Sequence, residues 1–248
     1  MQEFGPFDGL LLVDKPAGPT SHDIIDGIRW QFGLKKVGHC GTLDPAATGL
    51  LLVVVGKATR LSERLLSDDK VYEGIIKMGE VTDSYDAAGE VVESHEVPVD
   101  LSLEQLQEAG REFLGDIMQE PPMVSAVKKE GVPLYKLARK GVKVERKARL
   151  VHVYEFPLLH FQSPRVWFRV RCTKGGYVRS LAHELGARIG CGAHLERLHR
   201  TQSGSFKCDD AIRFEELLGL DRDGLAQRII PIRELARILG PMFSGAKN

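Results

Sequence analysis

The fold of this chain is decided by the stretch Gly38-His39-Cys40-Gly41-Thr42-Leu43-Asp44-Pro45-Ala46-Ala47-Thr48-Gly49 and by the apolar run over residues 50–55 that follows it. Six apolar residues in succession are typical of a strand that is buried on both faces. The glycines and the proline before this run predict a tight loop. That loop would hold Asp44 at the edge of a core, as a catalytic carboxylate requires, although an ordinary Asp-Pro turn would give the same local pattern.

Hydrophobic patterns on either side of this stretch predict both helices and strands. Residues 20–32 are expected to form a helix capped by Thr20 or Ser21, and residues 166–172 alternate as in a half-buried strand. The further elements expected are strands at residues 9–16 and 71–78 and helices at 102–114, 180–189, 208–220 and 223–239, the last interrupted by Pro231. Because strands and helices interleave irregularly, we expect an α+β fold with a central mixed or largely antiparallel sheet flanked by helices.

Length and composition describe an ordinary globular protein. The chain has 248 residues, 43% hydrophobic and 27% charged, which allows one large domain or one domain with a small appendage. The first residues lack a basic region followed by an apolar run, and every apolar run is too short to cross a bilayer. None of the 4 cysteines forms a Cys-x-x-Cys pair. We therefore expect free thiols in a cytoplasmic protein that does not bind a membrane.

Charge is segregated along the chain although the formal net charge is +0. Residues 80–120 hold twelve acidic side chains and one basic one, whereas residues 128–149 hold nine basic and two acidic ones. Residues 165–200 hold eight basic and two acidic side chains. A neutral total can therefore conceal one basic face that binds a polyanion, while mixed solvated surfaces are the alternative.

Spacing excludes the common phosphate and metal motifs. The glycines near Lys57 do not have P-loop spacing, and residues 83–89 do not place oxygen ligands at the alternate positions of a calcium loop. His183, His194 and His199 have no metal-binding spacing with the cysteines. A single aspartate remains, with aromatic and basic residues elsewhere in the chain.

The loop around Asp44 resembles the catalytic loop of the TruB family of tRNA pseudouridine synthases, G-H-x-G-x-L-D-P-x-A-x-G, at every fixed position. Further segments resemble that family in the same order, namely residues 13–21, 70–89, 121–128, 131–141, 173–180 and 192–200. The resemblance spans about residues 9–206, which is most of the chain. It implies a pseudouridine synthase fold.

The resemblance also implies roles for individual residues. Asp44 is expected to be the catalytic nucleophile, and Arg179 is expected to pair with it. Tyr72 is expected to pack on a flipped uracil. The resemblance leaves two targets for the attack by Asp44, the sugar C1′ and the base C6. The substrate-binding residues implied are His39, Tyr72, Tyr177, Arg179, Leu198 and Lys15, with Lys15 supporting either the active-site region or a phosphate. The reaction implies no cofactor and no metal.

The implied function is isomerisation of the T-loop uridine at position 55 of tRNA to pseudouridine, with the T-arm stem-loop as the RNA partner and the protein as a monomer. Residues 1–206 would form the catalytic domain and residues 207–248 a short C-terminal helical extension, too short for the RNA-binding PUA domain that is common in the family. Two alternatives remain. One is an RNA-binding or tRNA-folding protein on the same scaffold, and the other is a synthase subunit directed by a guide RNA.

Overall fold

The computed structural model describes residues 4–122, 128–129, 132–133 and 147–240. The expected family segments at residues 121–128 and 131–141, and the basic run at 128–149, lie mostly outside the described residues. The chain divides into two compact units. The first unit contains residues 1–70 and 199–248, and the second contains residues 71–198.

The first unit is built on the strand that follows Asp44. Strand β3 (Thr48–Val55) pairs antiparallel with β1 (Gly9–Lys15), in a register that places Leu11 opposite Val53. On its other side β3 pairs antiparallel with β2 (Val37–Cys40) and parallel with the end of β13 (Ala193–Ser203). The short strands at this sheet are β14 (Phe206–Lys207), β15 (Ile212–Arg213) and β16 (Ile230–Pro231).

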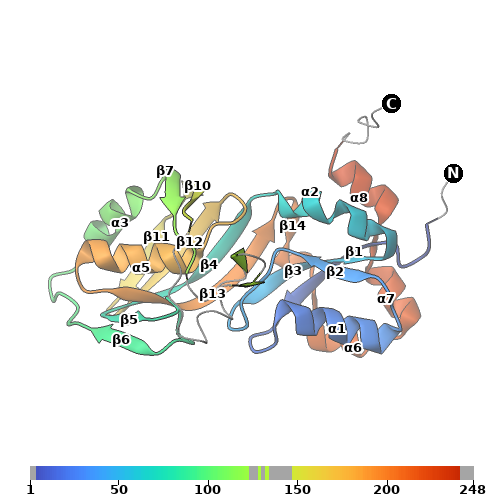
Figure 1. Ribbon diagram of the computed structural model, residues 1–248, viewed down its shortest axis with the longest axis horizontal. Coiled ribbons are helices and arrows are strands. Elements are labelled where there is room, and N and C mark those ends of the chain that lie inside the picture. Colours follow the sequence, from blue (N-terminus) through green and yellow to red (C-terminus); the bar gives the residue numbers. More distant parts are fainter. Residues whose placement is uncertain (1–3, 123–127, 130–131, 134–146, 241–248) are drawn as a thin grey trace. The chain divides into compact units, whose positions relative to one another are not determined.

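Both faces of β1 and β3 are covered, as the unbroken apolar run predicts. One face packs Leu11, Val13, Leu51 and Val53 against helix α1 (Ser21–Phe32) and its neighbours. The other face packs the alternate residues of the same strands against short helices (Figure 1). The helices are α1, α6 (Phe214–Leu218) and α7 (Arg222–Arg228) at the first face, and the 3-10 turn η1 (Gly56–Leu61), α2 (Ser62–Leu66) and α8 (Ile232–Ile238) at the second.

The second unit is a largely antiparallel sheet with two helices against it (Figure 1). The strand order is β13, β4 (Lys70–Met78), β12 (Arg165–Cys172), β10 (Arg149–Glu155) and β7 (Gly115–Gln119), and β11 (Leu158–Gln162) pairs with β12. Helices α3 (Leu103–Arg111) and α5 (Val178–Ile189) bury Leu106, Leu181 and Leu185 in one cluster with Phe168. The smaller pairs are β5 (Glu80–Thr82) with β6 (Val91–Ser94) and β8 (Lys128–Lys129) with β9 (Val132–Pro133).

The expected α+β class with a mixed, largely antiparallel sheet is therefore confirmed. Thr20 is the N-cap of α1 and forms a capping box with Asp23, and Pro231 separates α7 from α8 as expected. The loop predicted over residues 38–49 is wrong at both ends, because β2 includes Cys40 and β3 begins at Thr48. The edge of β3 offers unpaired backbone groups, and the Val-Gly-His-Cys segment satisfies them despite its glycine.

Candidate active site

Asp44 lies half-buried in a turn that is fixed from several sides. The turn closes through the Ala47 amide, which donates to the Asp44 carbonyl at 3.0 Å. The buried Ser21 hydroxyl, at the start of α1, donates to the Leu43 carbonyl at 3.0 Å and accepts from the Leu43 amide at 2.9 Å. The neighbour of Asp44 is thereby fastened to a helix whose own start is capped. A clamped backbone limits the directions in which the carboxylate can point, which is the preorganisation that a nucleophile requires.

Lys15 fastens the other side of the same turn. Its side chain is fully buried, and its Nζ donates to the carbonyls of Pro16, Pro19 and Pro45 at 2.7, 2.8 and 3.1 Å. Burial lowers the pKa of Lys15 to about 8, and the nearby Asp44 carboxylate opposes that shift. An ammonium group has three N–H donors, and these three carbonyls use them. Lys15 therefore holds the Asp44 turn against the loop after β1.

Arg200 connects the two ends of the Asp44 loop. This buried side chain donates from Nε to the Leu50 carbonyl at 2.7 Å and from a terminal nitrogen to the Gly41 carbonyl at 2.9 Å. Gly49 has φ +98, and a Cβ there would lie 2.5 Å from the Arg200 carbonyl oxygen. Glycine is therefore required where the loop enters β3 beside the end of β13.

His39 stands on β2, opposite Val53 of β3. Its Nδ1 is buried and has no hydrogen-bond partner among the described residues. Burial, and then the Arg200 charge, lower the pKa of His39. Both effects favour the neutral form of the ring over the imidazolium.

Arg179 and Asp86 form the buried ion pair of the second unit. Arg179 is the second residue of α5, and its guanidinium lies 3.2 Å from an Asp86 carboxylate oxygen, with side chains 5% and 15% exposed. The same guanidinium donates to the Ser84 carbonyl at 3.2 Å. The other Asp86 oxygen accepts from the Ser84 hydroxyl at 2.6 Å and from the Ala88 amide at 3.0 Å. Arg179 is thus oriented by a carboxylate that is itself held by its own loop.

The start of α5 is tied to the end of β7. Gln119 is buried, donates to the Tyr177 carbonyl at 3.0 Å and accepts from the Tyr177 amide at 2.6 Å. The Ser180 hydroxyl donates to the Glu120 carbonyl at 2.9 Å. Tyr177, the N-cap residue, supplies no side-chain cap, and these bonds instead join the start of the helix to the end of β7. They fix the helix end that carries Tyr177 and Arg179.

Tyr72 on β4 and Leu198 on β13 are half-buried and pack against the hydrophobic cluster of the second unit. The seven residues expected from the sequence are thus divided. Lys15, His39 and Asp44 belong to the first unit, with Lys15 at the Asp44 turn. Tyr72, Tyr177, Arg179 and Leu198 belong to the second.

Three supporting residues were not singled out as site residues in the sequence. Asp86 was visible only as part of the T-D-x-x-D-x-x-G segment, and Arg200 only as the end of another segment. Gln119 carried no signal, because a glutamine at a strand end is ordinary. All three place a polar group away from solvent, where it bonds to other parts of the site. Arg200 and Gln119 bond to backbone groups, and Asp86 is held by its own loop and faces Arg179. Such burial follows from tertiary structure and not from spacing.

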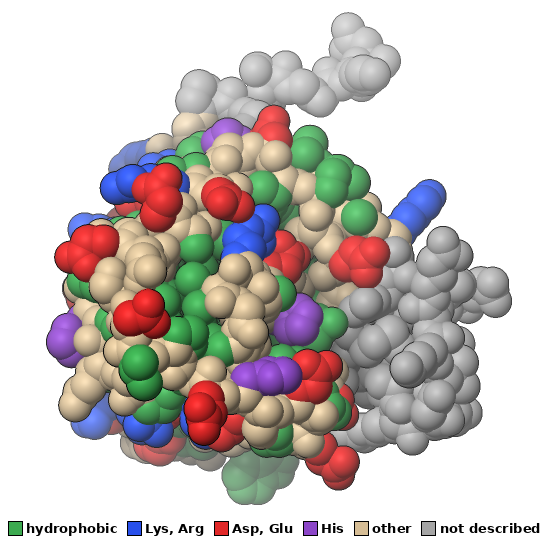
Figure 2. All heavy atoms as spheres, turned by 90° about the vertical axis from the view of Figure 1, so that its left-hand side faces the viewer, with side chains coloured by type: hydrophobic (Ala, Val, Ile, Leu, Met, Phe, Trp, Pro, Cys, Tyr) green, Lys and Arg blue, Asp and Glu red, His purple; other side chains and the backbone are tan. Residues whose placement is uncertain are grey.

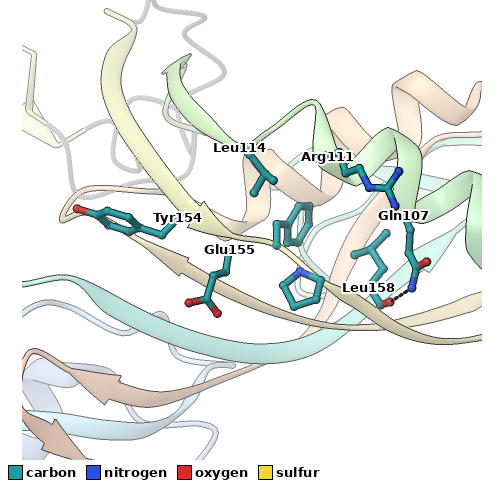
Figure 3. Close-up of a pocket in the computed structure, with 8 residues that line it drawn as sticks. Gln107, Arg111, Leu114, Tyr154, Glu155 and Leu158 are labelled. Atoms are coloured by element: carbon teal, nitrogen blue, oxygen red, sulfur yellow. Dashed lines mark hydrogen bonds between the residues drawn. The ribbon is translucent and has the colours of Figure 1, made fainter.

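A separate hollow of about 500 Å³ lies in the second unit beside the end of α3 (Figure 3). It is open, and none of the seven expected site residues lines it. Its Gln107 amide is already used, because it donates to the Leu158 carbonyl at 2.9 Å. The face drawn in Figure 2 shows acidic, basic and apolar side chains next to one another.

The described residues contain no group of three or more His, Cys, Asp or Glu arranged to hold a metal ion. The four cysteines are free thiols, and burial raises the pKa of Cys40 to about 11. In the part of the chain that the structure describes, no helix has the length and apolar character needed to cross a membrane.

Comparisons with known proteins identify the family of this chain. Residues 29–178 match the model of the TruB family pseudouridylate synthase N-terminal domain. Residues 179–244 match that of the tRNA pseudouridylate synthase B C-terminal domain. The first match alone covers more than half of the chain. This chain therefore belongs to the TruB family of pseudouridine synthases.

Curated relatives extend over most of the chain. A protein of Opitutus terrae named tRNA pseudouridine synthase B is 50% identical over 92% of this chain and 95% of its own length. A protein of Solibacter usitatus with the same name is 46% identical over 95% of this chain and 80% of its own length.

Solved structures share the fold. A chain in the crystal structure of a Cbf5-Nop10-Gar1 complex superposes with a TM-score of 0.72 at 31% identity over 94% of this chain. A chain in the structure of an H/ACA RNP bound to a substrate RNA containing 2′-deoxyuridine gives a TM-score of 0.68 at 28% identity. This chain spans 63% and 62% of those two chains.

Proposed function

We propose that this protein is a tRNA pseudouridine synthase that isomerises the T-loop uridine at position 55 and uses Asp44 as its nucleophile. The observation that carries the proposal is the half-buried Asp44 turn, which is clamped by Ser21 and Lys15 in a chain of the TruB family. The close relatives named tRNA pseudouridine synthase B favour a tRNA substrate.

The reaction is an isomerisation in which atoms balance without an added group. The bond between N1 of uracil and C1′ of the ribose breaks, the base turns, and a bond forms between C5 and C1′. C5 then loses its proton to water and N1 gains one from water, so the product is an isomer of the substrate. Asp44 supplies the electron pair that forms a transient covalent bond to the nucleoside and later leaves it. The Lys15 charge beside Asp44 favours the ionised carboxylate that this step needs.

The second unit supplies the partners of that nucleophile in the proposed site. Arg179 presents a guanidinium that Asp86 orients, and we assign it the pairing with Asp44. Tyr72, Tyr177 and Leu198 offer aromatic and apolar surface on which a flipped uracil packs. Taking a nucleotide out of its stack costs a few kcal/mol, and we assign to His39 the task of occupying the position that it vacates in the T loop. The lowered pKa of His39 favours a neutral ring for that task.

Recognition of the T-arm stem-loop by shape and phosphate contacts follows from how proteins bind folded RNA. The proposal includes action as a monomer in the cytoplasm. It also includes a catalytic domain over residues 1–206, with residues 207–248 as a short helical extension. That extension packs Leu217, Leu225 and Leu235 against the strands of the first unit.

The decisive experiment is release of tritium from T-arm RNA that carries [5-³H]uridine. We expect the wild-type protein to release tritium and Asp44→Asn to release none while it still binds the RNA. Asp26→Asn removes an exposed carboxylate from α1 and is the matched control, so it should release tritium at the wild-type rate. Tight RNA binding without release by the wild-type protein would instead favour the RNA-binding or guide-directed alternatives.

A further inference from the structure

The loop that carries Asp86, the ion-pair partner of Arg179, contains a backbone outlier. Tyr85 has φ 63, and among the described residues it is the one non-glycine residue whose φ is positive. A tyrosine in the left-handed region is sterically unfavourable, and such conformations persist only where surrounding contacts hold them. The loop is tight, because the Tyr85 amide donates to the Thr82 carbonyl at 3.2 Å and the Thr82 hydroxyl donates to the Asp86 carbonyl at 2.7 Å.

The Tyr85 ring stacks on His183. The ring centroids are 3.9 Å apart and the planes differ by 10°. Both side chains are half-buried, so the stack also removes apolar surface from water. This contact is one of the surrounding interactions that hold the unfavourable backbone at Tyr85.

The stack stands directly beside the Arg179–Asp86 pair. His183 lies four residues after Arg179 on α5, so the two side chains share one face of the helix. Tyr85 precedes Asp86 on the loop. Two consecutive loop residues therefore contact two consecutive turns of α5. Tyr85 stacks on His183, and Asp86 forms an ion pair with Arg179.

The backbone of the loop is also attached to β13. The Leu195 amide donates to the Tyr85 carbonyl at 3.0 Å, and the Ala87 amide donates to the Leu195 carbonyl at 3.0 Å. These bonds fix the main chain on both sides of Asp86 to β13, and the Arg179 bond to the Ser84 carbonyl joins the same loop to α5. The approach of the carboxylate to Arg179 then depends on contacts to that helix.

We propose that Tyr85 and His183 are positioning residues, whose stack holds Asp86 and Arg179 in the orientation that the isomerisation requires. This inference rests on the proposed function, since it assigns a task to the arginine of that site. An arginine side chain has many rotamers, and a guanidinium held in one direction avoids an entropic cost in each turnover. The rings themselves touch neither RNA nor Asp44 in this proposal, so they act through Arg179.

The test compares variants that keep or remove the stack. His183→Phe and Tyr85→Phe keep two flat rings, whereas His183→Ala and Tyr85→Gly each remove one. Tyr85→Gly also relieves the backbone, because glycine adopts positive φ freely, so this variant keeps a folded loop available for the measurement. His160→Ala is the matched control, because His160 contacts Trp167 in a tilted ring pair of the same unit.

Single-turnover tritium release and tRNA binding are measured separately for each variant. Loss of the stack should lower the single-turnover rate by about tenfold or more, with the Kd for tRNA within about twofold of wild type. The phenylalanine variants and His160→Ala should stay within about twofold of the wild-type rate. In an Asp86→Asn background, Tyr85→Gly should have no further effect. Unchanged rates in His183→Ala and Tyr85→Gly, or a loss that lies only in the Kd, would overturn the proposal.

A second readout does not depend on activity. In protein labelled with ¹⁵N-arginine, the Arg179 Nε–H signal, assigned through Arg179→Lys, should exchange slowly in the wild type and in His183→Phe. It should exchange much faster in His183→Ala. An unchanged signal in His183→Ala refutes the positioning role, whereas a wild-type protein that releases no tritium refutes only the proposed function.

Discussion

Buried cations organise both parts of the candidate site. Lys15 and Arg200 direct their donors at backbone carbonyls around the Asp44 loop, and Arg179 is directed at the Asp86 carboxylate. Burying a charge is unfavourable unless hydrogen bonds and opposite charges compensate it. Stability alone therefore does not explain these side chains. We explain them by the backbone and carboxylate groups that they orient.

Lys15 should make stability rise with pH. Its pKa in the folded protein is about 8, below the ordinary value of 10.5, so the unfolded state binds more protons between these two pH values. The free energy of unfolding then increases with pH across this window, by up to about 1.4 kcal/mol per pH unit, and is unaffected by this group below it. Denaturant unfolding of wild type and Lys15→Met from pH 7 to 10.5 measures the difference in slope. Parallel curves for wild type and Lys15→Met would contradict the prediction. The control is Lys35→Met, at an exposed position, whose curve should be parallel to that of wild type.

Replacing Asp86 by asparagine should impair both stability and turnover. The amide side chain would keep the shape of the aspartate but would leave the nearly buried Arg179 without this carboxylate. We expect the free energy of unfolding to fall by about 1–3 kcal/mol and single-turnover tritium release to fall by about tenfold or more, with tRNA binding retained. Asp100→Asn, at an exposed position of the same unit, is the control. Wild-type release by Asp86→Asn would show that the ion pair has no part in the reaction.

Among the elements, the entry into β3 is the least tolerant point. Gly49 combines φ +98 with backbone atoms of Arg200 that a Cβ would meet at 2.5 and 2.8 Å. Gly49→Ala should therefore lower the free energy of unfolding by about 3 kcal/mol or more, because β3 and β13 would have to separate. Gly175→Ala separates the effect of the positive φ from that of the close contacts, since Gly175 has φ +82 with nothing within 4 Å. This substitution should lower the free energy of unfolding by only about 1–2 kcal/mol. Equal losses in urea unfolding would mean that backbone conformation alone sets the requirement.

Elements with local signals were predictable from the sequence. The cap at Thr20 or Ser21, the apolar run of β3 and the break at Pro231 each act within a few residues, and the structure has all three, with Thr20 as the cap. The helix expected over residues 102–114 ends at Arg111, since its last turn gives way to the bend into β7. Strand β2 was missed because its pairing partner, not its composition, makes it a strand.

The candidate site rests on a different kind of signal. The family resemblance selected Asp44, Arg179 and their companions, whose roles stay predictions. The residues that hold them could not be found in this way, since the Gln119 bonds to Tyr177 join positions 58 residues apart. Contacts of that kind have no spacing rule.

For the whole molecule, the chain passes between its two units inside strands. The boundaries fall after Lys70, at the start of β4, and after Leu198, within β13. Tyr72 follows the first boundary by two residues, and Leu198 immediately precedes the second. Two residues expected to contact the uracil thus lie where the chain is held in extended, paired backbone. Rigid elements position side chains more accurately than loops do.

The C-terminal segment should be required for folding of the first unit. Residues 207–248 contribute Ile212, Leu217, Leu225 and Ile229 to one face of the β1–β3 layer and Leu235 to the other. Burying side chains of this size stabilises by about 1.5–3 kcal/mol each, so losing all five approaches the whole stability of a typical domain.

A chain that ends at residue 206 should therefore lose the cooperative thermal transition of the first unit in circular dichroism and should release no tritium. Two point variants in α8 compare the loss of stability at a buried position with that at a more exposed one. Leu235→Ala, at a fully buried position, should lower the free energy of unfolding by about 2–5 kcal/mol, whereas Ile238→Ala, at a position 40% exposed, should lower it by less than about 1 kcal/mol. A truncated chain that melts cooperatively near the wild-type Tm would mean that the strands of the first unit are stable without this cover. Residues 207–248 would then be an accessory to the catalytic domain and not part of its core.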